Sequence, residues 1–365
     1  MNFLKKIFRH LSHAEASNDE DFWVWFLSRA EGFYQIVRSN KRVDEGFLEL
    51  VMPRLQMVNP QFYCLTGMCD KDTAELIITA EGDIKSFVFA EELVARAPAI
   101  TGWKFTALKP PTAMDSFSLN MEAYTFDNNN IHFFYNDDAA YPDEINISLL
   151  YEGYSDSDKK TITQGCLLYL ENSLGELNMA TQIDDLSVAP ELPAGKDAIP
   201  IAKLEGFLAW REKELIEKYE GTRHDTKNDN YSIMEARDKE GFPVIALINR
   251  DLLQWEVKAS HPWMMIIEIS YDGSSRSGMP DSHLSAAMDQ LETSLEEQLP
   301  DSEGYLNLGR VTYSGKRTIY FACKEFRRSS LVAAAALRQQ ELLQVSYDIY
   351  KDKYWQSMNR FKAED

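Results

Sequence analysis

Cysteine is scarce in this sequence and forms no pattern that would build a scaffold. The 365 residues include four cysteines: Cys64, Cys69, Cys166 and Cys323. Small secreted domains that depend on disulfides contain far more cysteine, and zinc or redox sites usually need a Cys-x-x-Cys pair, which this sequence lacks. We therefore expect reduced, mostly buried thiols and a cytoplasmic location. A disulfide or metal site at Cys64 and Cys69 is the alternative.

Long apolar runs are also missing, so no segment approaches the length of a membrane-spanning helix. Residues 1–11 alternate apolar and basic side chains at helical spacing, without the continuous apolar stretch of a signal peptide. We interpret residues 1–20 as an amphipathic arm that is either frayed or docked as a helix on the rest of the protein. A weak contact with an anionic membrane is the alternative, although three cations give little anchoring.

Local catalytic and metal-binding motifs are not found. None of the six histidines forms a His-x-x-x-His pair, and the sequence has neither a Walker-type nor a dinucleotide-binding glycine pattern. Residues 273–278 lack the glycines that flank the serine of a nucleophile elbow. We therefore predict no catalytic residue, no metal and no cofactor. An enzyme stays the alternative, because catalytic groups that meet only in the fold leave no local motif.

Basic residues are missing from one long stretch. The whole chain has 58 acidic and 38 basic residues, a formal charge of −20, with 44% apolar residues as in ordinary globular proteins. Residues 110–195 contain 15 acidic residues against Lys159 and Lys160, and residues 110–158 contain no lysine or arginine. This charge argues against nucleic-acid binding, which depends on basic side chains that release counterions from phosphates.

The acidic stretch interleaves carboxylates with aromatic side chains. Acidic surfaces steer basic partners, and aromatic side chains at the centre of an interface supply much of the binding energy. We predict docking of a basic protein partner, with these candidate residues: Asp127, Tyr135, Asp137, Asp138, Asp143, Glu144 and Glu152. The alternative is a solubilising acidic surface over a core that contains the aromatic residues.

Hydrophobic periodicity predicts mixed helices and strands in the first half of the chain. We expect helices at residues 21–33, 44–57, 88–96, 161–177 and 203–219, and strands at 61–68, 75–79, 103–108, 122–126, 131–135, 145–151 and 181–188. The strands at 61–68 and 75–79 form a hairpin, because a short polar segment joins them. The polar residues 221–230 mark a domain boundary.

The second half has a clearer order. We expect strands at residues 231–237, 242–248, 263–271, 306–313, 318–323 and 344–350, with helices at 281–299 and 329–342. From Trp263 onward the order is β-α-β-β-α-β, which is typical of a ferredoxin-like unit.

The predicted fold class is α+β, with two domains of antiparallel sheet and helices on one face of each. The domains follow the arm at residues 1–20: an acidic α+β domain at 21–200, a linker helix and loop at 201–230, and a ferredoxin-like domain at 231–365. Leu-Glu-x-Ser-Leu segments at residues 170–174 and 291–295 leave open whether the halves are a duplication.

Several short motifs in the second half occur in a particular order. They are Gly241-Phe242-Pro243, His261-Pro262-Trp263, Gly278-Met279-Pro280, Leu291-Glu292, Gly309-Arg310-Val311-Thr312, Gly315-Lys316-Arg317 and Tyr320-Phe321. In these motifs the chain resembles the uncharacterised bacterial domain-of-unknown-function family 695. The resemblance implies a fold and favours a binding role, but it implies no catalytic residue.

The end of the chain has a second, shorter similarity. Residues 345–352 followed by Trp355 resemble the strand and tryptophan that end the domains related to regulator of ribonuclease E activity B. That resemblance implies a small acidic ferredoxin-like protein that inhibits a ribonuclease by binding it. The first half resembles no family that we can name.

Two residues of these motifs are candidates for a ligand site. His261 precedes Pro262, which favours extended backbone, so we interpret it as a histidine at a strand edge, with a catalytic base as the alternative. Arg310 on a strand either pairs with a buried carboxylate or binds an anionic ligand.

We therefore predict a non-catalytic binding or regulatory protein that docks a basic protein partner. The partner would be a nucleic-acid enzyme that it regulates or a basic toxin against which it gives immunity. The alternative is a hydrolase or small-ligand-binding protein with a site at His261 and Arg310.

Overall fold

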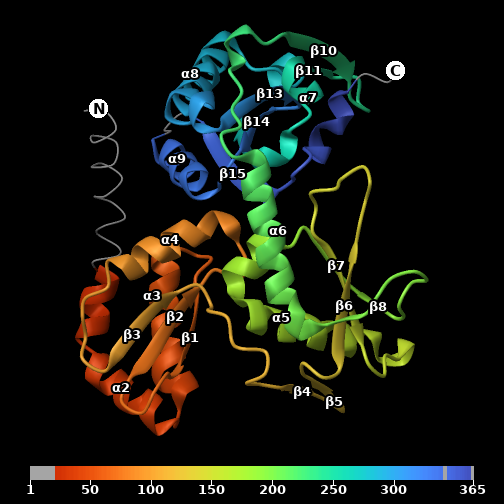
Figure 1. Ribbon diagram of the computed structural model, residues 1–365. Helices are drawn as coiled ribbons and strands as arrows, with labels where there is room; N and C mark the ends of the chain where they lie inside the picture. The colour runs from red at the N-terminus through yellow and green to blue at the C-terminus, as the bar shows by residue number, and fades with distance from the viewer. Residues whose placement is uncertain (1–20, 340–342, 363–365) are drawn as a thin grey trace. The chain divides into compact units, whose positions relative to one another are not determined.

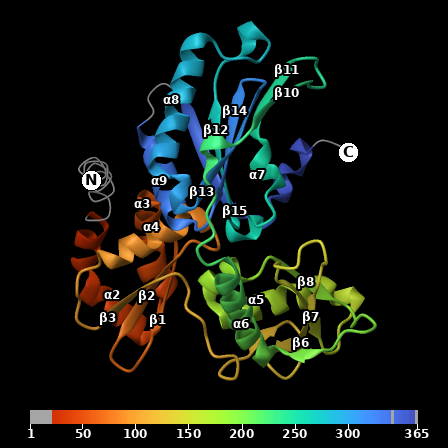
Figure 2. The ribbon, with the colours of Figure 1, turned by 45° about the horizontal axis from the view of Figure 1, so that its top comes forward.

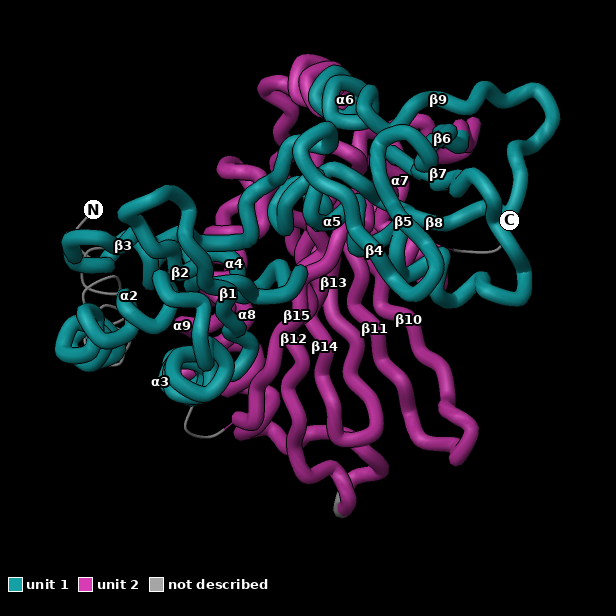
Figure 3. Tube along the Cα trace, turned by 90° about the horizontal axis from the view of Figure 1, so that it is seen from below, with its two compact units in different colours: residues 1–136, 145–210 teal, residues 137–144, 211–365 magenta. Residues whose placement is uncertain are grey.

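The computed structural model describes residues 21–339 and 343–362, except for the side chain of Ser275. The predicted arm at residues 1–20 lies outside them. The chain divides into two compact units, coloured separately in Figure 3. Unit 1 comprises Met1–Asn136 and Ile145–Trp210, and unit 2 comprises Asp137–Glu144 and Arg211–Asp365.

The first part of unit 1 is a small sheet with helices around it (Figure 1). Residues 21–27 are helical, and the further elements are α2 (Ala30–Ser39), the π-helical turn η1 (Asp44–Leu48), α3 (Glu49–Val58), β1 (Tyr63–Met68), β2 (Ala74–Thr79), α4 (Ile84–Ala95) and β3 (Trp103–Ala107). The core is aromatic: Phe26 packs edge-on against Trp103, and Phe33 packs edge-on against Phe47. The predicted hairpin of β1 and β2 is confirmed.

The second part of unit 1 contains a hairpin, a four-stranded sheet and two helices. The elements are β4 (Leu119–Met121), β5 (Tyr124–Phe126), β6 (Ile131–Asn136), β7 (Asn146–Tyr151), η2 (Asp156–Asp158), α5 (Lys159–Gln182), β8 (Asp185–Ala189), β9 (Ile199–Pro200), η3 (Ile201–Lys203) and α6 (Leu204–Tyr219), whose last turns belong to unit 2. The sheet order is β8-β7-β6-β9. Helix α5 bends at Gly175, whose φ of 74° brings the backbone against Lys109 and Pro111.

The sheets of unit 1 are mixed rather than wholly antiparallel, which corrects the prediction for this half. Strands β2 and β3 pair in parallel, and so do β7 and β8. In each case a helix joins the two strands, α4 in the first pair and α5 in the second. A helical crossover returns the chain to the same end of the sheet, so the next strand runs in the same direction.

Unit 2 is built on a six-stranded antiparallel sheet. Its elements are η4 (Thr226–Asn228), β10 (Tyr231–Arg237), β11 (Pro243–Asn249), α7 (Arg250–Gln254), η5 (Lys258–Ser260), β12 (Trp263–Ser270), η6 (Ser274–Arg276), α8 (Ser282–Gln298), η7 (Asp301–Glu303), β13 (Tyr305–Tyr313), β14 (Lys316–Cys323), α9 (Arg327–Arg338), β15 (Gln344–Lys351) and η8 (Gln356–Phe361). The strand order is β10-β11-β13-β14-β12-β15. From β12 onward the elements follow the predicted order. The α+β class is confirmed, and the ferredoxin-like name stays a prediction.

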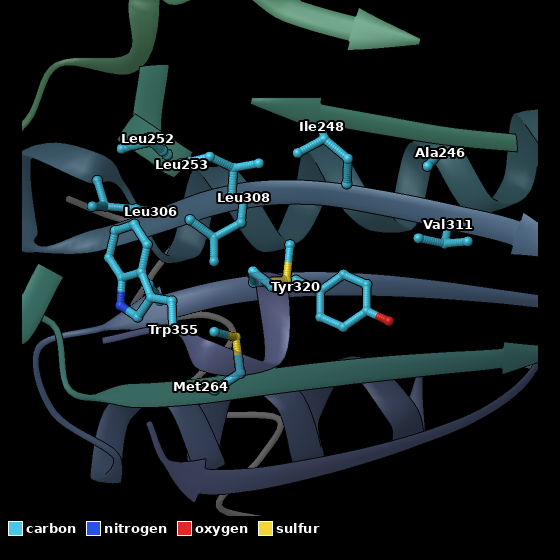
Figure 4. Close-up of a cluster of buried hydrophobic side chains, with 12 residues drawn as sticks. Ala246, Ile248, Leu252, Leu253, Met264, Leu306, Leu308, Val311, Tyr320 and Trp355 are labelled. Atoms are coloured by element: carbon cyan, nitrogen blue, oxygen red, sulfur yellow. The ribbon is translucent and has the colours of Figure 1, made fainter. Parts of the chain in front are cut away.

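Both faces of this sheet are covered, whereas the sequence predicts helices on one face. Figure 2 shows α8 and α9 on one side of the sheet and α7 with the C-terminal segment on the other. The second side is a hydrophobic cluster in which Leu252, Trp355 and Met358 pack on strand residues such as Met264 and Leu308 (Figure 4). Strand β12 lies between β14 and β15, and neighbouring residues of a strand point in opposite directions. One of its faces is fully buried, whereas on the other face Met264 is buried and Ile266 is partly buried.

A β-bulge in β13 explains the glycine of the Gly309-Arg310 motif. The pairing of β13 with β14 shifts register between Asn307 and Gly309, and the side chain of Asn307 accepts a hydrogen bond from the Gly309 amide. Gly309 has a φ of 125°, and a Cβ there would lie 2.1 Å from the carbonyl oxygen of Leu247. Only glycine fits this conformation and this close approach.

No helix among the described residues is both long and apolar enough to cross a membrane.

Candidate functional site

The structure divides the predicted docking residues into separate groups. Asp127 and Glu152 lie in unit 1 at one end of strands β6 and β7, where the Glu152 amide donates to the carbonyl of Asn130 at 2.8 Å. Tyr135 lies near the opposite end of β6. The other four predicted residues, Asp137, Asp138, Asp143 and Glu144, belong to unit 2.

The end of unit 1 that holds Asp127 and Glu152 contains further carboxylates. We define the acidic tip as Glu122, Asp127, Glu152, Asp156 and Asp158. Local hydrogen bonds fix two of these carboxylates: Thr161 donates to Glu122 at 3.3 Å, and Asp127 accepts the backbone amides of Asn129 and Asn130. The turn at residues 127–130 therefore holds Asp127 at the rim of a small sheet.

Two tyrosines lie among the carboxylates of the acidic tip. The Tyr124 hydroxyl donates to Asp158 at 3.0 Å, and the Tyr151 hydroxyl donates to the carbonyl of Thr125 at 2.9 Å. The two rings meet edge-on, with centroids 6.0 Å apart. Hydrogen bonds from Ser157 and Tyr124 lower the pKa of Asp158 and so favour its ionised form.

A groove runs along the first half of α5, beside the acidic tip. It has a volume of about 700 Å³ and is lined by Asp156, Ser157, Lys159, Lys160, Thr163, Gln164, Leu167, Leu168 and Glu171. Lys159 and Lys160, the first two residues of α5, are exposed. They supply the only lysines or arginines of the stretch 110–195, so the surface becomes basic for one helical turn next to the tip.

Tyr135 packs against a helix instead of joining the tip. Its ring stacks on Phe207 of α6 with centroids 5.1 Å apart, and the Lys196 ammonium lies 5.4 Å from the ring centroid. Its side chain is 38% exposed. Tyr135 is therefore available to a partner, but at the opposite end of β6 from Asp127.

Asp143 is buried in unit 2, which removes it from an exposed docking surface. Its carboxylate accepts hydrogen bonds from the Lys218 ammonium at 2.6 Å, the Tyr219 hydroxyl at 2.5 Å and the Tyr354 hydroxyl at 2.8 Å. The buried Lys353 ammonium donates to the Asp143 carbonyl at 2.7 Å. Burial opposes ionisation, but these hydrogen bonds outweigh it and lower the pKa of Asp143. Asp143 therefore anchors segment 137–144 within unit 2.

The neighbours of Asp143 differ in exposure. Asp137 and Asp138 are exposed, and Asp138 accepts the Ala140 amide in a turn. Glu144 is half-buried and accepts a hydrogen bond from the Gln356 side chain at 2.8 Å. Asp137 and Asp138 thus present charge to solvent, whereas Glu144 takes part in the packing of segment 137–144.

Arg310 pairs with a buried carboxylate. On the face of the sheet covered by α8, its guanidinium lies 2.6 Å from Glu292, and the neighbouring Arg317 lies 2.6 Å from Asp289. Asn307 bridges Glu292 and Glu296, and burial raises the pKa of Glu296. These contacts occupy the guanidinium of Arg310 within the fold.

His261 is 1% exposed and lies near the other face of the sheet. Its ring packs against Trp255, with centroids 5.3 Å apart, and its carbonyl accepts the Trp355 indole. The Ser260 hydroxyl donates to the carbonyl of Val257, so it accepts from Nδ1–H of His261, and Nε2 holds the lone pair. Among the described atoms Nε2 has no partner. His261 and Arg310 therefore do not converge on one site.

The docking residues predicted from the sequence do not include four residues at the tip of unit 1: Glu122, Tyr124, Asp156 and Asp158. Their signal in the sequence was the absence of lysine and arginine from residues 110–158. That signal could not show which acids meet, because the contacts join Tyr124 to Asp158 and Glu122 to Thr161 across more than 30 residues.

Comparisons with known proteins place only the C-terminal part of the chain. Searches of the curated proteins and of the solved structures returned no match. The similarity to regulator of ribonuclease E activity B therefore stays a prediction. Residues 236–361, from β10 to η8, match the model of a family of unknown function (DUF695), which confirms the family resemblance predicted for this part.

Proposed function

We propose that this protein binds a basic protein partner through the acidic tip of unit 1. The observation that supports the proposal is that the adjacent rings of Tyr124 and Tyr151 lie among carboxylates. Tyr124 donates to Asp158, and the charges of Glu122 and Asp127 act on Tyr124 and Tyr151 respectively, in a stretch that has no lysine or arginine between residues 110 and 158. Charges of one sign at the rim of a small sheet add their fields and attract a basic partner over about a Debye length, roughly 8 Å at physiological salt.

The two tyrosines would contribute affinity after the carboxylates have steered the partner. Both rings are half-buried, and each hydroxyl already has a hydrogen-bond partner within unit 1. A side chain that is fixed before binding loses little conformational entropy on binding. Tyrosines held in this way are typical anchors of protein interfaces.

The partner would be a nucleic-acid enzyme that the protein regulates or a basic toxin that it neutralises. Both are protein classes that carry basic surfaces for phosphate binding. The proposal also locates the interaction in the cytoplasm. In this proposal unit 1 supplies the docking surface, and unit 2 supplies a folded domain of the family of unknown function.

The test compares two variants with the same loss of charge. The tip variant is E122Q/D127N/E152Q/D156N, which keeps Asp158 and its hydrogen bond to Tyr124. The control variant changes four exposed glutamates elsewhere: Glu205, Glu220, Glu256 and Glu297 to Gln. Each protein is used to capture partners from host cells, and the association rate with the purified partner is then measured at several salt concentrations.

We expect the tip variant to associate roughly 10-fold or more slowly than wild type at low salt, and the difference to shrink as salt rises. The control variant should keep the wild-type rate. Equal rates for the tip variant and wild type would refute the proposal. Capture of acidic partners alone would also contradict it.

A further inference from the structure

Strand β10 forms a free edge of the sheet in unit 2. It is the first strand of the order β10-β11-β13-β14-β12-β15 and pairs only with β11 among the described residues. Figure 3 shows it at the border of the sheet. Its seven residues, Tyr231–Arg237, contain no proline. An exposed edge of this length is a template for another strand unless something blocks it.

The hydrogen bonds at the two ends of β10 show which backbone groups face outward. At one end the Arg250 amide donates to the carbonyl of Asn230, and at the other the Asp238 amide donates to the carbonyl of Phe242. Even-numbered residues therefore direct their amides and carbonyls toward β11. Because these directions alternate in an antiparallel strand, the amides and carbonyls of Tyr231, Ile233, Glu235 and Arg237 face away from the sheet.

The same edge exposes apolar side chains. Ile233 is 70% exposed, Tyr231 46% and Ile245 39%. Residues that pair across neighbouring strands lie on the same face of the sheet, and Ile233 pairs with Leu247, which in turn pairs with Arg310. Arg310 faces α8, so Ile233 lies on the α8 face, together with Tyr231 and Ile245 at alternate positions of the two strands. The exposed fractions of Tyr231, Ile233 and Ile245 show that the apolar surface on this face of the β10–β11 hairpin is partly open to solvent. An exposed apolar edge strand is unfavourable in a monomer.

The charge of β10 favours a second copy of this chain over a basic partner. Its only charged residues are Glu235 and Arg237, so the strand is neutral in a protein of formal charge −20. We propose that two copies pair antiparallel through β10 and continue the sheet across a two-fold axis at Ile233. Ile233 then lies opposite Ile233 of the second copy, and Glu235 lies opposite Tyr231. An axis at Glu235 is disfavoured because it would oppose two carboxylates.

Two substitutions test this pairing in different ways. Glu235→Pro removes an amide that faces away from β11, so the β10–β11 ladder keeps its hydrogen bonds while the outer edge is blocked. Ile233→Lys places a charge at the proposed axis. The control is Ile216→Lys on α6, where an isoleucine that is 64% exposed receives the same charge. Circular dichroism establishes that each full-length variant is folded.

Sedimentation equilibrium then measures the mass of each protein over a range of concentrations. We expect wild type and Ile216→Lys to form dimers of twice the 41.9 kDa chain. Glu235→Pro and Ile233→Lys should raise the dimer dissociation constant at least 10-fold. A wild-type monomer at the highest soluble concentration would overturn the proposal. A dimer that survives both edge variants, or that is lost equally in Ile216→Lys, would also overturn it.

Discussion

Acidification is expected to destabilise unit 2 through His261. The ring is buried between Ser260 and Trp255, and its Nε2 has no described partner. Burial lowers the pKa of His261 from 6.5 to about 4, and the positive charges of Arg223, Lys324 and His224 act in the same direction. A proton on Nε2 would therefore be a buried charge without an acceptor.

The lowered pKa of His261 decides whether acid stabilises or destabilises the fold. Between pH 6.5 and about 4 the unfolded chain binds a proton at His261 that the folded chain does not bind, so stability falls as the pH falls through this window. The contribution of His261 is fully present above pH 6.5 and is exhausted below about pH 4. Each unit of pKa difference corresponds to about 1.4 kcal/mol, so lowering the pH from 7 to 4.5 should cost roughly 2 kcal/mol at this residue.

The assay is urea unfolding followed by tryptophan fluorescence, at pH 7 and pH 4.5, for wild type and His261→Phe. The phenylalanine ring keeps the contact with Trp255 but does not titrate. We expect the variant to lose roughly 2 kcal/mol less stability than wild type on acidification. His261→Asn, which keeps a donor toward Ser260, is the second variant, and His283→Gln on the exposed side of α8 is the control. Identical pH dependence in wild type and both His261 variants would refute the reasoning.

Two further predictions concern single residues of unit 2. Asp143→Asn removes the ion pair with Lys218 and the negative charge that accepts the hydrogen bonds of Tyr219 and Tyr354. We expect the free energy of unfolding, measured with urea at pH 7, to fall by about 2–3 kcal/mol. A fall of less than about 0.5 kcal/mol would show that these contacts contribute little to stability. Gly309→Ala should cost about 3 kcal/mol, because its Cβ meets the Leu247 carbonyl, whereas Gly67→Ala, with open space around its Cβ, should change the free energy of unfolding by less than about 1 kcal/mol. Equal costs at the two glycines would contradict the assignment of the bulge.

Local patterns were enough to place most helices and strands. The stripe of Phe22 and Phe26 marked the first helix, and the apolar run that begins at Trp263 marked β12. These elements depend on periodicity over a few residues, which the sequence displays directly. Strand direction was harder to predict. The parallel pairing of β7 with β8 depends on where α5 returns the chain, and no residue pattern within either strand records it.

At the candidate site, too, the sequence predicted one part and left another part to the fold. The depletion of lysine and arginine from residues 110–158 identified an acidic region without any structure. Asp143 and Glu152 look alike in that sequence, since each is a carboxylate on a polar loop. In the fold Asp143 is buried under Lys218, Tyr219 and Tyr354, whereas Glu152 is exposed at the acidic tip.

The sequence by itself determined the α+β class, the positions of most elements, the acidic stretch and the family resemblance of the C-terminal part. Each of these is a property of composition, of periodicity or of motifs in a fixed order. Only the tertiary structure decided which carboxylates gather around Tyr124, that Arg310 is paired with Glu292, and that β10 has a free edge. Those features depend on contacts between residues far apart in the chain, and such contacts form only when the chain has folded.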